Sequence, residues 1–194
     1  MKTNILQFPN DHIDLRSHST PMKIDISSLA VPELLQLFGQ ILLELRQRSI
    51  SRTNNLPTGE YAEYLFSKAF NIPLETNSKM GYDAIAPDGT RYQIKGRRIT
   101  QFNKSRQLSS IRDIYDRPFD FIAVVLFDER YKIIKAALIP WNVSTQICSH
   151  VPRTNSYKVI ASNKHLSIKG VLDVTDELKQ AEETEGAPEE TRTV

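Results

Sequence analysis

Three polar residues within residues 81–98 have the types and the spacing to act together on a phosphodiester. Asp83 is followed, after nine intervening residues, by Gln93, and Lys95 lies two positions further on. A carboxylate and an amide carbonyl are oxygen ligands of the kind that a hard cation prefers. An ammonium group can position the attacking water or stabilise developing negative charge. The pattern therefore indicates metal-dependent phosphodiester hydrolysis, provided that the three side chains meet.

The turn between these residues decides whether they meet. Residues 87–89 read Pro-Asp-Gly, which fits a type I turn followed by a left-handed glycine. Counting back along both strands of the resulting hairpin places Asp83 directly across from Gln93. The two-residue alternation of a strand returns Lys95 to the same face. The alternative is an ordinary exposed hairpin with polar residues on its solvent face.

This arrangement resembles the PD-(D/E)XK motif of the restriction-endonuclease-like nuclease superfamily. Tyr82 stands where the motif has Pro, and Gln93 stands where it has Asp or Glu. A glutamine can still offer its carbonyl oxygen but brings no charge, and QxK versions of the motif occur in active members. The resemblance implies that Asp83 and Gln93 bind Mg²⁺, with Mn²⁺ as a substitute. It also implies that Lys95 is catalytic.

The segment Thr58–Phe70 is predicted to be a helix with one apolar face. At about 100° per residue, Glu63 falls at the edge of that face and Glu60 points nearly away from it. In nucleases of this superfamily the helix before the motif often presents a glutamate in a G-x-x-x-E setting, which Gly59 to Glu63 resembles. Glu63 is therefore expected to complete the metal site and to supply the charge that Gln93 lacks. Glu60 remains the other candidate.

A basic stretch follows the hairpin and provides candidate contacts for phosphate groups. Residues 105–114 are expected to form either a short helix with its basic side toward nucleic acid or a solvated loop. The candidate nucleic-acid-binding residues in and before this segment are Arg97, Arg98, Lys104, Arg106 and Arg112.

Charge and composition agree with a nucleic-acid partner without requiring one. The chain has 194 residues and a net charge of +2, but residues 171–194 carry eight acidic and two basic side chains. The last 24 residues therefore hold −6, and the first 170 hold +8. Such a distribution suits DNA binding, with RNA remaining open, and it also suits simple solubility. A single cysteine, Cys148, and the absence of a long apolar run predict a cytoplasmic protein without a membrane partner.

The remaining segments predict an α/β fold in three regions. Residues 1–25 are expected to be a flexible arm, residues 26–180 a single nuclease-like domain, and residues 181–194 a disordered acidic tail. The segment from about 58 to 140 resembles the αβββαβ core of the superfamily, a mixed sheet flanked by helices, with an added N-terminal helix. Other expected elements are helices at 31–48 and 141–150, a short helix after Asp173, and strands at 119–127, 131–139 and 156–161.

These observations lead to two hypotheses about function. The first is a magnesium-dependent DNA endonuclease that acts in defence or in the life of a mobile element, with a homodimer as one expected state. The second is a nuclease-fold subunit whose site has decayed at Gln93 and which binds nucleic acid or scaffolds a complex. The longer pattern NN-x(3)-GxYAE…GYDA…QIKGRR…RPFD also resembles a set of bacterial proteins.

Overall fold

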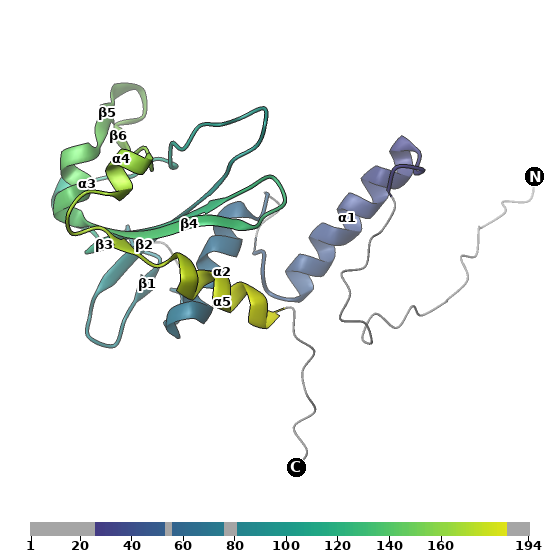
Figure 1. The fold of residues 1–194 in the computed structure, drawn as a ribbon, viewed down its shortest axis with the longest axis horizontal. Coiled ribbons are helices and arrows are strands. Elements are labelled where there is room, and N and C mark those ends of the chain that lie inside the picture. Colours follow the sequence, from purple (N-terminus) through teal and green to yellow (C-terminus); the bar gives the residue numbers. More distant parts are fainter. Residues whose placement is uncertain (1–25, 53–55, 76–80, 186–194) are drawn as a thin grey trace, which may run out of the picture.

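One mixed β-sheet organises the described part of the chain. The computed structural model describes residues 26–52, 56–75 and 81–185, and Figure 1 shows their helices arranged around the sheet. The strand pair β2 and β3 is parallel, whereas the other neighbouring pairs are antiparallel. The predicted α/β class with a mixed, helix-flanked sheet is therefore confirmed. Across the sheet the strands are β1 (Ala84–Ile85), β2 (Arg91–Arg98), β3 (Phe121–Phe127), β4 (Ile133–Pro140) and β7 (Leu172–Asp173).

The two faces of the sheet are covered by different parts of the chain. Helices α2 (Thr58–Phe70) and α5 (Thr175–Glu185) pack on one face and contact each other. Residues 99–120, helix α3 (Trp141–Ile147) and a two-stranded ribbon cover the other face. The ribbon and the remaining short elements are β5 (Ser149–Val151), β6 (Ser156–Lys158), α4 (Asn163–Leu166) and the 3₁₀ turns η1 (Ile114–Asp116) and η2 (Pro152–Thr154).

Strand β3 lies between the two resulting hydrophobic cores. Val125 and Phe127 point into the core beneath α2 and α5. Ile122, Val124 and Leu126 point into the core on the opposite face. A strand that is buried on both faces has a nearly continuous apolar sequence, which is why residues 119–127 predicted a central strand correctly.

The hairpin that carries the candidate site closes as its turn residues predict. The backbone N–H of Ala86 donates to the carbonyl of Thr90 at 2.9 Å, and that of Gly89 donates to the carbonyl of Ala86 at 2.9 Å. Gly89 has a φ of +86°, the left-handed conformation that a residue with a side chain rarely adopts. The Asp88 side chain also accepts a hydrogen bond from the N–H of Thr90. This turn confirms the expected loop of three residues.

The crossover from β2 to β3 differs from its prediction, because residues 105–114 form no helix. The N–H of Leu108 donates to the carbonyl of Val159, and the N–H of Ile111 donates to the carbonyl of Tyr157. These backbone groups are thus paired with a distant segment instead of with their own turn. The buried side chains of Leu108 and Ile111 fix the segment beneath the sheet. The helical alternative for residues 105–114 was wrong.

The later elements are close to their expected positions. Residues 119–127 and 131–139 form the antiparallel pair β3 and β4, and a shorter helix, α3, follows at the start of 141–150. Strand β6 lies within 156–161 but pairs with β5 outside the main sheet. Helix α5 continues to Glu185, so the first residues of the predicted acidic tail are helical. Residues 1–25 and 186–194 lie outside the described part of the chain.

Helix α1 (Val31–Gln47) forms as predicted but buries none of its side chains fully. Leu35 is 66% exposed and Phe38 is 47% exposed. The helix stands beside the sheet and its covering layers instead of within them (Figure 1). None of the helices in the described residues combines the length and the hydropathy needed to cross a bilayer.

The absence of a side chain at Gly96 allows α2 to approach β2 very closely. A Cβ atom at this position would lie 2.3 Å from the carbonyl oxygen of Thr58 and 2.9 Å from the Cβ of Ala62. Both distances are shorter than van der Waals contact, and the first involves backbone. The register of α2 on the sheet, and with it the position of Glu63, therefore depends on this glycine.

We expect Gly96→Ala to lower the free energy of unfolding by about 1–3 kcal/mol, because an added methyl group in a packed contact forces the backbone to shift. Chemical denaturation measures the change. Gly59→Ala is the matched control. Gly59 lies in α2, the helix that packs against Gly96, and a Cβ at Gly59 meets nothing within 4 Å. Equal effects of the two substitutions would contradict the role assigned to Gly96.

Candidate functional site

Asp83 lies just beyond the end of β1 and binds the edge of β2. The strand pairing ends at Ala84 opposite Tyr92, and the N–H of Asp83 donates to the carbonyl of Tyr92 at 2.7 Å. The Oδ2 atom of Asp83 accepts a hydrogen bond from the N–H of Ile94 at 2.7 Å. The hairpin register, with Ala84 opposite Tyr92 and Ile85 opposite Arg91, is the predicted one, and the paired strand ends one residue before Asp83 and Gln93. The carboxylate takes the place of a ladder carbonyl between Gln93 and Lys95.

Gln93 points away from α2 and is almost fully buried. Ile94 belongs to the core beneath α2, so alternation along β2 places Gln93 on the opposite face. The Gln93 residue is 9% exposed, and its Oε1 atom has no hydrogen-bond donor among the described residues. A buried acceptor without a donor is rare in folded proteins and indicates a functional group or a bound species.

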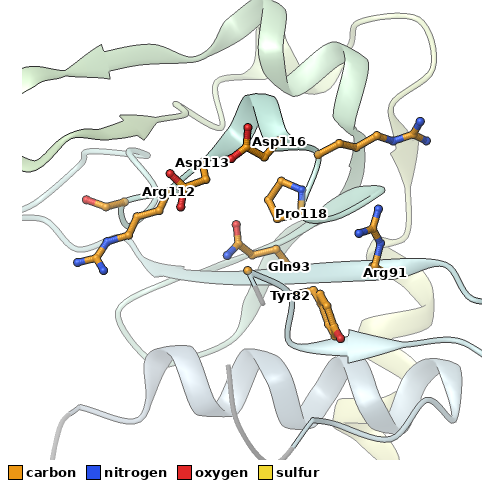
Figure 2. A pocket seen from close by; sticks show the side chains of 10 residues that line it. Tyr82, Arg91, Gln93, Arg112, Asp113, Asp116 and Pro118 are labelled. Atoms are coloured by element: carbon orange, nitrogen blue, oxygen red, sulfur yellow. The ribbon is translucent and has the colours of Figure 1, made fainter. Parts of the chain in front are cut away.

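A polar pocket of about 620 Å³ opens beside Gln93. Figure 2 shows the amide of Gln93 pointing from β2 toward the crossover segment that carries Asp113 and Asp116. Tyr82 and Arg91 lie along the other side of the opening. The pocket therefore lies between the hairpin and the crossover and includes the residue before Asp83.

Lys95 lies in the field of two carboxylates. Burial lowers the pKa of its ammonium group, while Asp83 and then Glu63 act in the opposite direction and favour the charged form. A buried lysine that interacts with acidic groups is a common feature of functional sites. The structure thus brings three of the four predicted catalytic residues into one electrostatic cluster.

Glu63 completes this cluster from α2. Burial, and secondly the charge of Asp83, raise the pKa of its carboxyl from 4.5 to about 6, while Arg52 and Lys95 oppose the shift. The side chain is 18% exposed and forms an ion pair with the guanidinium of Arg52. Arg52 lies between α1 and α2, and its role had not been predicted from the sequence.

Glu60, the alternative to Glu63, has a different set of contacts. Its Oε2 accepts a hydrogen bond from the Ser51 hydroxyl at 2.5 Å, and its Oε1 accepts one from the N–H of Arg52 at 2.8 Å. The side chain thereby fixes the segment after α1 to the start of α2. The structure places Glu63, and not Glu60, beside Asp83 and Lys95.

The five candidate phosphate contacts do not form one patch. Arg97 donates to the carbonyl of Ser105 at 2.9 Å. Arg98 lies on another face, where it donates to the carbonyl of Glu129 and stacks 4.8 Å from the ring centroid of Tyr131.

The other three basic residues are also separate. Arg106 binds the side chain of Asn163 at 2.5 Å. Lys104 is exposed, and only Arg112 among the five lines the pocket beside Gln93. Asp113 and Asp116 also line it and had not been predicted. Their signal in the sequence is an Asp-x-x-Asp spacing in a loop, which is too common to be specific.

Comparison of the sequence with models of known protein families and with curated proteins gave no match. Among residues 26–52, 56–75 and 81–185, no group of three His, Cys, Asp or Glu side chains is placed to hold a metal ion. The candidate site has two carboxylates, Glu63 and Asp83, and an amide as its third oxygen donor.

The raised pKa of Glu63 predicts a specific dependence of stability on pH. Between pH 4.5 and about 6 the folded protein binds this proton more tightly than the unfolded chain does. The contribution of Glu63 to the free energy of unfolding should therefore fall as the pH rises through that interval. We expect Glu63→Gln to remove this component, as measured by urea unfolding across the interval.

Glu44→Gln is the control for the loss of one carboxylate, because Glu44 lies at an exposed position of α1. An equal change of slope in the two variants would contradict the assignment to Glu63.

Proposed function

We propose that the chain is a metal-dependent nuclease whose site consists of Glu63, Asp83, Gln93 and Lys95. The observation that carries the proposal is the partly buried position of Lys95 in the field of two carboxylates that come from separate elements, α2 and the hairpin. A buried ammonium with acidic neighbours at the edge of a sheet has the chemistry to hold a water molecule or a phosphoryl oxygen in place.

The donor set fits a hard divalent cation. Asp83 and Glu63 provide carboxylate oxygens, and the Oε1 atom of Gln93 is a buried carbonyl oxygen without a donor. Asp83 and Glu63 would hold Mg²⁺ or Mn²⁺, whereas Gln93 faces the separate pocket. Such an ion, when bound, lowers the pKa of water and neutralises charge on the phosphate.

Contacts within the protein fix the positions of the two carboxylates. The hydrogen bond from Ile94 N–H to Asp83 fixes one carboxylate oxygen against β2. The close packing at Gly96 fixes α2, which carries Glu63. Lys95 then holds its proton in the field of both carboxylates and stabilises negative charge that develops on the scissile phosphate.

The same proposal includes a restriction-endonuclease-like core and DNA as the substrate. The order of a helix, a hairpin with the polar residues, and a buried central strand supports it. The parallel pairing of β2 and β3 means that a crossover, and not a hairpin, joins these two strands. RNA as a substrate and a role in defence or in a mobile element stay part of the proposal by family analogy.

The test is cleavage of supercoiled plasmid by the purified full chain with Mg²⁺ or Mn²⁺, beside an EDTA control. We expect nicking that Asp83→Ala abolishes and that Lys95→Ala reduces by about 100-fold or more, the typical effect of losing one group that stabilises transition-state charge. DNA binding by Lys95→Ala should persist in a mobility-shift assay. Lys104→Ala, at an exposed position, is the control for loss of one lysine.

Undiminished cleavage by Lys95→Ala would refute the assigned mechanism. Absence of cleavage by the unaltered protein under every metal condition would refute the nuclease proposal itself.

The charge balance of the site favours a second candidate, a nucleic-acid-binding or scaffolding subunit without catalysis. Glu63 and Asp83 carry two negative charges, and Arg52 and Lys95 carry two positive charges in the same cluster. The carboxylates therefore have cationic partners without a metal. If this second function is correct, the unaltered protein binds DNA without cutting it, and Gln93→Glu, which adds the missing charge, restores divalent-metal binding measured by calorimetry.

A further inference from the structure

The pocket beside Gln93 has chemical features that the nuclease site does not explain. Its floor is the amide of Gln93, whose Oε1 is buried and lacks a donor among the described residues. Its walls belong to two segments that are distant in the sequence, Gly81–Tyr82 on the hairpin and residues 110–118 on the crossover. Lys95 and Glu63 do not line it.

The charged groups around the pocket differ in whether the protein already binds them. Arg91 and Arg117 both bind the carboxylate of Asp120. Arg112, in contrast, has no ion pair or hydrogen bond to any described residue, and the same holds for the carboxylates of Asp113 and Asp116. One cation and two carboxylates on the rim are thus available to a ligand, above a buried acceptor on the floor.

These groups match a ligand that combines an anion with N–H donors on one rigid body. A nucleotide has this combination, because its phosphate is the anion and the exocyclic amine of adenine, cytosine or guanine offers two N–H groups, whereas thymine offers a single imide N–H. A volume of about 620 Å³ lies within the range of sites for small organic molecules. An anion alone would leave the Oε1 atom of Gln93 without a donor, and a metal alone would leave Arg112 without an anion.

We infer that this pocket binds one unpaired nucleotide of the substrate strand. The inference rests on the proposed nuclease function, because the pocket adjoins the candidate site: Tyr82 directly precedes Asp83, and Gln93 lies two residues before Lys95. Arg112 contacts the phosphate, and Gln93 and Asp113 accept hydrogen bonds from the base. The substrate is therefore single-stranded at the site of cleavage or has a base turned out of the duplex.

The experiment titrates the full chain, in EDTA, with the four deoxynucleoside monophosphates and with inorganic phosphate, and measures binding by calorimetry. We expect the three nucleotides with an exocyclic amine to bind more tightly than thymidine monophosphate, and phosphate to bind most weakly. Arg112→Ala should weaken nucleotide binding by roughly tenfold or more, as expected for the loss of one charge-assisted hydrogen bond. Arg106→Ala is the matched control, since Arg106 lies on the same crossover but outside the pocket.

Equal affinity of Arg112→Ala and the unaltered protein would overturn the inference, as would phosphate binding as tightly as the nucleotides. In a second titration without EDTA, binding of Mg²⁺ that requires Asp113 and displaces nucleotide would also overturn it and indicate a cation site. Because the first titration contains no metal, its outcome is independent of cleavage. Plasmid cleavage without nucleotide binding would support the nuclease function and contradict the nucleotide pocket. Nucleotide binding without cleavage would support the pocket and contradict the nuclease function.

Discussion

The close contact between α2 and β2 at Gly96 is the constraint on which the candidate site depends. Glu63 is carried by α2 and Lys95 by β2, so their separation is set by how near the helix lies to the strand. With no Cβ at Gly96, the carbonyl of Thr58 can approach the strand to a distance that any other residue would prevent. One missing methyl group therefore determines whether an acidic and a basic side chain from separate elements share an environment.

That shared environment has an electrostatic consequence. Charged groups removed from water are costly unless opposite charges accompany them, and here Glu63, Asp83, Arg52 and Lys95 are balanced. The equal numbers of positive and negative charges lower the energetic cost of the cluster. They also mean that a divalent cation would have to compete with Arg52 and Lys95 for the carboxylates. The two candidate functions therefore differ in whether Glu63 binds Arg52 or a metal ion.

The sequence predicted those features that depend on local chemistry. The Pro-Asp-Gly turn, the fully apolar strand at 121–127 and the helix at Thr58–Phe70 each follow from residue type and period, and all three are present. Strand counting predicted the register of the hairpin but not the hydrogen bond in which the Asp83 carboxylate replaces a backbone carbonyl. The prediction of a helix at 105–114 was wrong because the backbone partners of this segment lie about 50 residues later.

Gln93 belongs both to the sequence motif and to the polar pocket. Its buried Oε1 lacks a donor in the described part of the chain, and an unpaired acceptor of this kind costs about 1–3 kcal/mol. A leucine would fill the same volume without that cost, so packing does not explain a glutamine here. The same atom faces a pocket and follows the spacing of a metal-binding motif. An amide, unlike a glutamate, can be buried without a counter-charge, which allows a site already balanced by Arg52 and Lys95 to keep an acceptor for a ligand.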